Sequence, residues 1–408
     1  MKSKYHRYEN LKQLSWFIMS RNILWLASWY PNILSPYDGD FIQRHAQAVA
    51  RFQKVSVIYI KKDEDGVVTK SVKTFSSVNK QVNEIIVYYH SLKTGIRFLH
   101  RLLSELRYKK TYRTVIRQYM PEKGRPDLVH VHVAWKAGVQ ATWVKRKFHI
   151  PFIVSEHWSG YFPEAQYGVK DLNAYQREML QRIFTEAQKV TAVSNELGKA
   201  ISKNFPIGNH AVVPNVVDTA IFFVKEKVKT GPVQFIHISS LRYEKNIDAI
   251  LDAFVKLRKR NENFRVVAYG PVIDKYQNYL DKNKLHDMIH FKGEVTQNEL
   301  AVDLQQSDAL ILYSRYETFG CVVIEANACG VPVILSDLPV FREYITEEEN
   351  GLFVIPNNSK ALADKLEDFI KGKYVFSPKL IAENAFNKFN YEAVGKQFSA
   401  IYENLLTS

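Results

Sequence analysis

The 408-residue sequence has only two cysteines, Cys321 and Cys329, and they lie eight positions apart in one expected helix. That spacing prevents a disulfide within a helix, so the pair indicates packing thiols, in agreement with a reducing compartment. The sequence also lacks any run near the ~20 apolar residues that span a bilayer. Its basic N-terminus is followed only by the short apolar patch 16–19, far short of a signal-peptide core. These absences predict a cytoplasmic protein.

Nucleic-acid-binding modules are missing as well, since the chain has no zinc-finger spacing and no RNP-like aromatic strand. Yet 56 Lys and Arg residues outnumber 42 Asp and Glu residues and give a formal net charge of +14. Such an excess predicts an anionic partner, which can be nucleic acid, anionic lipid head groups or a sugar nucleotide. Because the modules are missing, we expect no nucleic acid and favour an anionic membrane surface.

A chain of this length is too long for one hydrophobic core and predicts two or three domains. Short apolar, β-rich runs alternate with helical patterns along most of it, which favours βαβ units and parallel sheets. We expect an N-terminal extension over 1–20, a Rossmann-like domain over 21–216 and a linker over 217–232. A second Rossmann-like domain over 233–388 and a last helix within 389–408 complete the predicted α/β architecture.

The stretch 313–337, YSRYETFGCVVIEANACGVPVILSD, is the most informative part of the sequence. It has the pattern of a strand, a loop, a helix and a second strand. Glu317 lies in the expected loop and Glu325 in the helix, ~12 Å apart if the segment were helical throughout. That spacing suits a long ligand held at both ends. Gly320 allows close backbone approach at the helix N-terminus, which attracts anions.

This motif, with Phe319-Gly320 after the first Glu and a Gly-Val-Pro-Val strand behind the second, resembles the signature of retaining GT-B glycosyltransferases of the group 1, family 4 type. The resemblance implies two facing domains and a C-terminal helix that crosses back to the first. It also implies that Glu317 holds hydroxyls of the donor sugar, that Phe319 and Gly320 offer backbone N–H groups, and that Glu325 binds the ribose. For an isolated pair of Glu residues, solvated surface charges would be the expected interpretation.

The segment 239–246 resembles the phosphate-binding Gly-Arg-Leu-x-x-x-Lys stretch of the same family. Lys245 matches the family lysine, which can neutralise a departing diphosphate. Ser240 stands where the family has Arg, so either Arg242 serves as the second cation or that cation is missing. Gly270, after its strand, fits a tight passage near the nucleotide.

In the first half, Gly39 precedes an expected helix over 41–52 and resembles the glycine that lets the backbone pass the diphosphate; a plain turn glycine is the alternative. Asp38 and Asp40 flank it as a D-x-D, a metal motif in another glycosyltransferase architecture. The Rossmann-like surroundings favour loop and helix N-cap roles for both. His157, at a strand end, matches a family histidine that contacts donor sugar and acceptor, although strand-end histidines are often only hydrogen-bonded residues.

His130 and His132 alternate with apolar residues and share one face of an expected strand. Two histidines on one face can be metal ligands, but the sequence offers no third ligand at a convincing spacing. We therefore expect neither a metal nor another cofactor.

A basic, amphipathic helix is expected within 88–120, where Glu105 is the one acid. Basic residues near an anionic leaflet contribute ~1 kcal/mol each, so this helix is a candidate for membrane association; a solvated face is the alternative. Its basic residues are Lys93, Arg97, Arg101, Arg107, Lys109, Lys110, Arg113 and Arg117, and its apolar stripe is Ile96, Leu99, Leu102, Leu103 and Leu106.

Taken together, these features predict a metal-independent glycosyltransferase that moves a sugar from a UDP- or GDP-sugar to an acceptor hydroxyl with retention. The acceptor expected is a glycan or lipid-linked intermediate of cell-envelope polysaccharide synthesis, and the enzyme is expected on the inner face of the membrane. Two alternatives are a sugar-nucleotide epimerase of similar architecture and a non-catalytic polyanion-binding protein. No residue distinguishes the donor nucleotide, the sugar or the acceptor.

Overall fold

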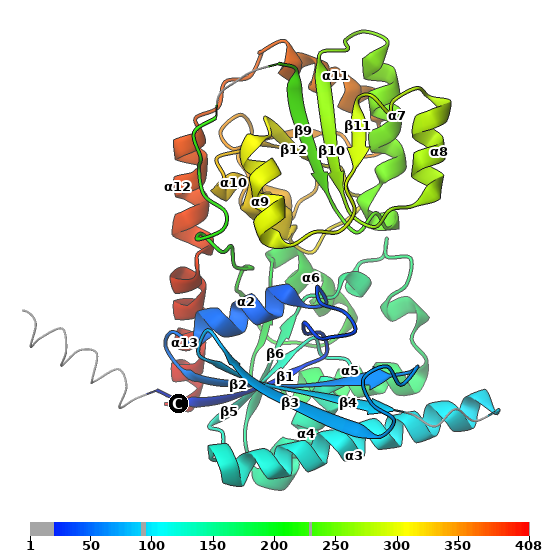
Figure 1. Cartoon of the computed structure of the whole chain (residues 1–408). Helices are drawn as coiled ribbons and strands as arrows, with labels where there is room; N and C mark the ends of the chain where they lie inside the picture. Colours follow the sequence, from blue (N-terminus) through cyan, green and yellow to red (C-terminus); the bar gives the residue numbers. More distant parts are fainter. Residues whose placement is uncertain (1–19, 91–94, 228–230, 408) are drawn as a thin grey trace, which may run out of the picture.

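The computed structural model describes residues 20–90, 95–227 and 231–407, which form two α/β lobes stacked one above the other (Figure 1). The predicted N-terminal extension lies outside the described residues except for Ser20. Each lobe contains one sheet whose strands are mainly parallel and are flanked by helices. The α/β class and the two Rossmann-like domains predicted from the sequence are confirmed.

The first lobe contains an eight-stranded sheet in the order β3-β4-β2-β1-β5-β6-β7-β8. Its strands are β1 (Asn22–Ala27), β2 (Lys54–Asp63), β3 (Val72–Asn79), β4 (Val82–His90), β5 (Leu128–His132), β6 (Phe152–Glu156), β7 (Val190–Ala192) and β8 (Ala211–Val212). Its helices are α2 (Asp40–Val49), α3 (Arg97–Lys123), α4 (Ala137–Phe148), α5 (Ala174–Glu186) and α6 (Asn195–Asn204), with 3₁₀ turns η1 (Ser159–Tyr161) and η2 (Val169–Asp171).

Strand β1 lies in the middle of this sheet, between β2 and β5. Its residues 23–26 are completely buried. A continuous apolar run of this kind is typical of a parallel strand that is covered by helices on both faces. Because β1, β5 and β6 run in the same direction, their carboxyl ends meet at one edge of the sheet, which faces the second lobe.

The second lobe contains a six-stranded parallel sheet in the order β11-β10-β9-β12-β13-β14. Its strands are β9 (Val233–Ile238), β10 (Phe264–Tyr269), β11 (Ile289–Phe291), β12 (Ala309–Leu312), β13 (Val333–Ser336) and β14 (Gly351–Val354). Its helices are α7 (Ile247–Arg258), α8 (Asp274–Lys282), α9 (Gln297–Gln306), α10 (Cys321–Ala328), α11 (Ser359–Ile370) and α12 (Pro378–Phe389), with 3₁₀ turns η3 (Tyr243–Lys245) and η4 (Phe341–Glu343).

The last helix, α13 (Tyr391–Leu406), returns to the first lobe along the left side of Figure 1. Helix α12 packs against α10 of the second lobe, whereas α13 packs against α2 of the first. The Tyr402 hydroxyl lies 2.7 Å from His130 Nδ1 on β5. Within the predicted linker, Val217 and Phe222 are buried, and the Val217 N–H donates to the Phe389 carbonyl. The predicted crossing of the C-terminal helix is confirmed.

The hairpin of β3 and β4 was not predicted from the sequence. Strand β3 is the one antiparallel strand among the described residues of the first sheet, and it forms the edge. Residues 88–90, which the sequence places at the start of a basic helical stretch, end β4 instead. Helix α3 begins only at Arg97, and Lys93 lies outside the described residues.

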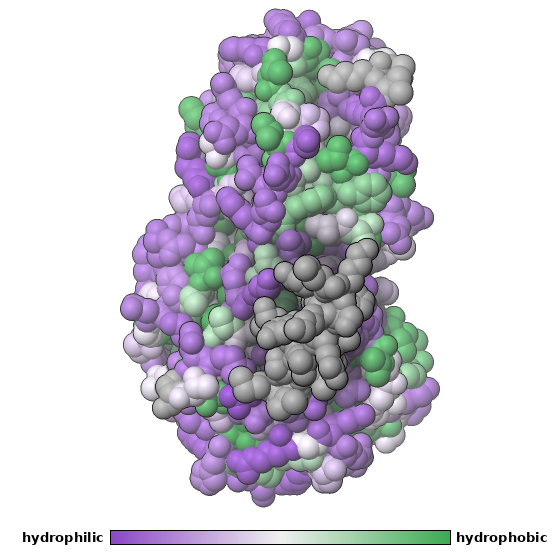
Figure 2. Space-filling model, turned by 90° about the vertical axis from the view of Figure 1, so that its left-hand side faces the viewer, coloured by the Kyte–Doolittle hydropathy of each residue, from purple (hydrophilic) through white to green (hydrophobic). Residues whose placement is uncertain are grey.

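The face that carries α12 and α13 is largely hydrophilic, with hydrophobic residues in small groups (Figure 2). Among the described residues, no helix is both long and apolar enough to cross a membrane.

Candidate active site

An ion pair between Lys245 and Glu317 lies at the carboxyl edge of the second sheet. Lys245 ends the η3 turn after β9, and Glu317 lies in the loop between β12 and α10. Because β9 and β12 are neighbouring parallel strands, the loops that follow them are adjacent. Lys245 Nζ donates to Glu317 Oε1 at 2.5 Å, and Ser314 Oγ donates to the same oxygen at 2.9 Å. The sequence predicted both charged residues, and the structure brings them together.

Both side chains of this pair are largely shielded from solvent, with 19% of Lys245 and 7% of Glu317 exposed. Burial lowers the pKa of the Lys245 ammonium, but the adjacent Glu317 carboxylate more than offsets this effect, so the pKa is raised overall. Lys245 therefore stays positively charged at neutral pH. A fixed positive charge at this position can stabilise negative charge that develops on a ligand.

Helix α10 begins directly after the Phe319-Gly320 pair. Gly320 is its N-cap residue, with φ of 87°, and a Cβ atom there would lie 3.0 Å from the Phe341 ring. A residue with a side chain would therefore strain this turn. Phe319 is buried, its ring stacks on Tyr344, and its carbonyl accepts a hydrogen bond from the Tyr344 hydroxyl. These contacts fix the N-terminus of α10, whose first N–H groups lack partners within the helix.

Glu325, further along α10, forms an ion pair with Arg44 of α2 in the other lobe. Arg44 Nη1 lies 2.7 Å from Glu325 Oε1, and the two side chains are 6% and 5% exposed. The guanidinium also contacts the Asp40 carboxylate at 3.0 Å and the Val216 carbonyl at 3.0 Å. Burial raises the pKa of Glu325 although Arg44 lowers it. Arg44 was missed in the sequence because nothing near it in the chain indicates a partner 281 positions away.

The other residues predicted for the second lobe lie close to the same edge. Arg242 is exposed and immediately precedes η3. Its charge contributes to lowering the pKa of Asp38 in the first lobe, although burial, the largest effect, raises that pKa overall. Gly270 directly follows β10, and its N–H donates to the Gly293 carbonyl at 3.1 Å.

Gly39 lies at the N-cap of α2, with φ of 69°. A Cβ atom there would lie 2.6 Å from the Trp29 carbonyl carbon, so the close approach of the two backbone segments requires glycine. The capping part of the role predicted for Asp38 and Asp40 is wrong, because Gly39 is the N-cap residue and α2 has no side-chain cap. Asp38 lies in the preceding loop, as predicted, and Asp40 lies in the first turn of the helix. Asp40 instead contacts Arg44 and accepts a hydrogen bond from Gln297 of the second lobe.

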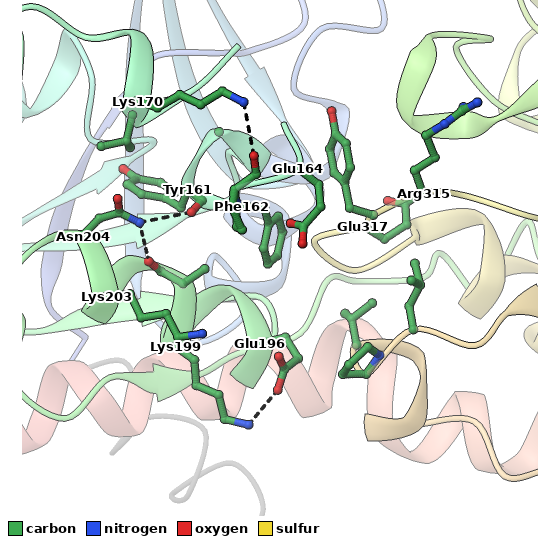
Figure 3. Close-up of a pocket in the computed structure, with 18 of the residues that line it drawn as sticks. Tyr161, Phe162, Glu164, Lys170, Glu196, Lys199, Lys203, Asn204, Arg315 and Glu317 are labelled. Atoms are coloured by element: carbon green, nitrogen blue, oxygen red, sulfur yellow. Dashed lines mark hydrogen bonds and ion pairs between the residues drawn. The ribbon is translucent and has the colours of Figure 1, made fainter. Parts of the chain in front are cut away.

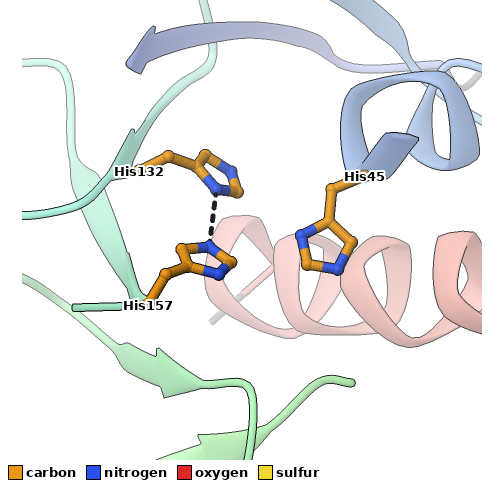
Figure 4. Close-up of side chains that lie close together, drawn as sticks. All are labelled: His45, His132 and His157. Carbon is orange, nitrogen blue, oxygen red and sulfur yellow. Dashed lines mark hydrogen bonds between the residues drawn. The ribbon is translucent and has the colours of Figure 1, made fainter. Parts of the chain in front are cut away.

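His157 follows β6 and is buried beside two other histidines, His132 at the end of β5 and His45 on α2 (Figure 4). His132 Nδ1 lies 3.3 Å from His157 Nε2, and one nitrogen from each ring lies within 4.8 Å of the others. Burial lowers the pKa of all three imidazoles, that of His45 to about 4.

Neutral imidazoles in this arrangement are suitable ligands for a transition metal. His45 is the third candidate ligand, which the sequence did not indicate because it belongs to a helix far from β5 and β6 in the chain. Helical spacing in α2 gives the one available signal, since it places His45 on the same face as other buried residues of that helix.

A cavity of about 530 Å³ opens between the lobes (Figure 3). Glu317, Arg315 and Tyr316 line it from the second lobe, together with the loop 338–340. The first lobe contributes residues of 160–164, 169–170, α5 and α6. Neither His157 nor Glu325 belongs to its lining. The structure therefore places Glu317 in the wall of an interlobe cavity, with Lys245 directly behind it.

Further contacts between the lobes lie beside this cavity. The Glu343 carboxylate accepts hydrogen bonds from the backbone N–H groups of Asn195 and Glu196 at 2.8 and 2.9 Å, at the N-terminus of α6. Ser194 Oγ donates to the Thr318 carbonyl at 2.7 Å. These hydrogen bonds hold the two lobes against each other next to Glu317.

Comparisons with known proteins agree with this geometry. The family Glycosyl transferases group 1 matches residues 218–388, and Glycosyltransferase Family 4 matches residues 67–221. An uncharacterized glycosyltransferase of Methanocaldococcus jannaschii is 26% identical over 68% of this chain and 76% of that protein. The putative teichuronic acid biosynthesis glycosyltransferase TuaC of Bacillus subtilis is 24% identical over 93% of this chain and 95% of that protein. The crystal structure of Anabaena HepE in complex with UDP and glucose has a TM-score of 0.68 and 16% identity, covering 94% of this chain and 99% of that chain.

The two facing lobes, the returning C-terminal helix and the interlobe site define a glycosyltransferase with the GT-B fold. The two family matches also identify the family. The chain belongs to the glycosyltransferases of the group 1, family 4 type. The predicted family and enzyme class are thereby confirmed. The epimerase and the non-catalytic polyanion-binding protein are not favoured.

Proposed function

We propose that this glycosyltransferase moves a sugar from a nucleoside-diphosphate donor to an acceptor hydroxyl with retention at the anomeric carbon. The observation that carries the proposal is the Lys245–Glu317 ion pair beside the interlobe cavity. A carboxylate accepts hydrogen bonds from sugar hydroxyls, and a buried ammonium stabilises a leaving phosphate. Both groups are needed within a few ångströms of the bond that breaks.

The chemical step follows from these two groups. As the bond from the anomeric carbon to the diphosphate oxygen breaks, negative charge develops on that oxygen. The acceptor oxygen forms the new bond to the anomeric carbon on the same face, and its proton passes to the departing phosphate. Lys245 is already charged and positioned, so it stabilises this charge without reorganising. The N–H groups at the N-terminus of α10, after Phe319 and Gly320, contribute to the same effect. In this scheme the transfer needs no metal, and we expect activity to persist in EDTA.

The remaining predicted residues are assigned to the donor and its surroundings. Glu325 binds the ribose, which requires that the donor replace its contact with Arg44. Arg242 supplies a second cation for the diphosphate, and Gly39 and Gly270 allow backbone to approach the donor. His157 is assigned to the transferred sugar from the first lobe, which requires that the sugar reach beyond the cavity lining to this buried histidine.

The donor is proposed to be a UDP- or GDP-sugar. Support comes from the UDP in the HepE structure and from the basic charge of the chain. The acceptor is proposed to be a lipid-linked or polysaccharide intermediate of cell-envelope glycan synthesis. The likeness to TuaC, named for teichuronic acid biosynthesis, supports this class.

The donor assignment is tested by thermal unfolding in the presence of UDP, GDP or ADP. Binding to the folded state raises apparent stability by about 2.7 kcal/mol at a ligand concentration of 100 Kd. We expect one of the first two nucleotides to raise the melting temperature most. The anomeric configuration of the product, determined by NMR with the matching sugar nucleotide, then tests retention. An inverted product, or no response to any nucleotide, would contradict the proposal.

We further propose a cytoplasmic enzyme that associates with the inner face of the membrane through the N-terminal half of α3. The predicted apolar stripe of this helix is exposed to solvent, and Arg101 and Lys110 are exposed beside it. Exposed apolar residues next to basic ones favour an interfacial position on anionic lipid. The exposed apolar side chains are Ile96, Phe98, Leu99, Leu102, Leu103 and Leu106, with exposed fractions between 40% and 76%.

Replacing Phe98 and Leu102 together by Glu should abolish binding to anionic vesicles, because it removes apolar contact area and adds two negative charges. Flotation with phosphatidylglycerol-containing and with pure phosphatidylcholine vesicles measures this. Leu380→Glu is the matched control, since Leu380 is 62% exposed on α12, far along the chain from α3. Equal flotation of the wild type with both kinds of vesicle would remove the membrane assignment.

A further inference from the structure

The interlobe cavity has room beyond Glu317 that the donor assignment does not use. Glu317 forms one part of its wall, while most of the remaining wall comes from the first lobe. If the donor sugar meets Glu317, as the proposed function requires, a molecule in the rest of the cavity lies next to the reacting carbon. The residues that line this part of the cavity therefore indicate the chemistry of the acceptor.

Aromatic side chains form part of the apolar lining. Phe162 of the first lobe and Tyr316 of the second lie with ring centroids 6.3 Å apart. Tyr161 is buried, and its hydroxyl donates to Glu156 at 2.9 Å, so its position is fixed. Ligand sites commonly combine such apolar surfaces with a few placed polar groups. This combination suits a sugar ring, which has apolar faces and polar edges.

Several charged groups in the lining are already engaged. Glu317 is paired with Lys245, and Glu196 with Lys199 at 2.6 Å. The Arg315 guanidinium is turned away from the cavity, toward the Tyr243 carbonyl at 2.5 Å (Figure 3). The two ion pairs leave no net charge for a ligand, and the Arg315 cation is directed away from the acceptor part.

Three cations of the first lobe remain, Lys170, Arg177 and Lys203, against one carboxylate, Glu164. Within the described ranges, none of the three cations forms an ion pair with a carboxylate. Lys170 Nζ donates to the Pro163 carbonyl at 3.2 Å, and the Arg177 guanidinium lies over the Phe205 ring at 5.7 Å. Like charges that line one cleft concentrate a ligand of opposite charge. The acceptor part of the cavity is thus positively charged.

We propose that this cavity binds acceptors in which a sugar ring carries an anionic group, either a carboxylate or a phosphate. The ring packs against Phe162 and Tyr316, and the anionic group contacts Arg177 and Lys203. This inference rests on the proposed function for its orientation, since Glu317 defines the donor end. The anionic group can belong to an acidic sugar or to the diphosphate of a lipid carrier.

Matched probes test the inference by calorimetry without any donor. The probes are p-nitrophenyl glucuronide, p-nitrophenyl glucoside and glucose linked to farnesyl diphosphate. We expect at least one anionic probe to bind about 10-fold more tightly than the neutral glucoside at low salt, with the difference shrinking at 0.5 M NaCl. Preference for the glucuronide assigns the charge to the sugar, and preference for the diphosphate assigns it to the carrier. Equal binding of all three probes overturns the inference.

The double variant Arg177→Gln and Lys203→Gln should lose this preference while keeping its affinity for the glucoside. The control variant Lys388→Gln changes an exposed lysine of α12 outside the cavity and should keep the preference for the anionic probe. The melting-temperature shift caused by nucleotides should be unchanged in both. A preference that survives the double variant overturns the inference, even when nucleotide binding is normal. Failure of the proposed function can be distinguished from failure of this inference. In that case the wild type itself shows no melting-temperature shift with nucleotides.

Discussion

Glu317→Gln should lower kcat for sugar transfer by about 10²–10³-fold, the range seen when a preorganised electrostatic group is removed from an active site. The amide has nearly the shape of the carboxylate, so the loop after β12 should keep its position. Its oxygen is a weaker acceptor for sugar hydroxyls, and Lys245 loses its counter-charge. Because burial lowers the pKa of Lys245 once Glu317 no longer raises it, the ammonium is also less available to the leaving diphosphate.

The measurement is kcat and KM with the preferred sugar nucleotide, together with the melting-temperature shift caused by the nucleotide alone. We expect kcat to fall and the shift to persist, since Glu325 and the start of α10 are unchanged. Glu383→Gln, on the exposed side of α12, is the control for charge removal elsewhere. A Glu317→Gln enzyme that retains more than about a third of wild-type kcat would show that this carboxylate does not act on the sugar.

The central motif could be predicted because its signals are local. The apolar strands β12 and β13, the glycine at the N-cap of α10 and the two Glu residues lie within the 28 consecutive positions 309–336. The expected order of strand, loop, helix and strand is the one observed. Lys245 could be added because it matches the family lysine, and the structure places it at the end of a short turn after β9, a neighbour of β12.

The β3–β4 hairpin could not be predicted because its turn carries none of the usual signals. Lys80 and Gln81 occupy its centre, both with positive φ. Hairpin turns of this kind normally contain Asn-Gly or Asp-Gly. Moreover, most of β3 is exposed, so the strand does not show the alternation that marks a half-buried strand.

His45 and Arg44 escaped prediction for a different reason. They are polar residues on the buried face of an amphipathic helix, and helical spacing indicates only that such a face exists. Their partners come from the distant β5, β6 and α10. Which side chains meet there depends on how the lobes pack, and no local pattern encodes that. The cavity between the lobes could not be predicted for the same reason.

Arg44→Met should lower the free energy of unfolding by about 3–5 kcal/mol, because it leaves the Glu325 carboxylate buried without its cation. Arg44 and Glu325 are among the least exposed charged side chains in ion pairs of the described structure. Burial already raises the pKa of Glu325, and the loss of Arg44 removes the main influence that lowers it. Urea unfolding followed by the fluorescence of the six tryptophans measures the change.

Two further variants show whether the cost arises from the unpaired charge. Adding Glu325→Leu to Arg44→Met should restore most of the lost stability, since replacing both members of a buried pair by apolar residues is often neutral. Arg21→Met is the control, because Arg21 and Glu403 are 32% and 36% exposed, and an exposed pair contributes ~1 kcal/mol or less. If Arg44→Met destabilises no more than Arg21→Met, the buried pair does not hold α2 against α10. The exchange of Arg44 for the ribose at Glu325 would then cost little free energy.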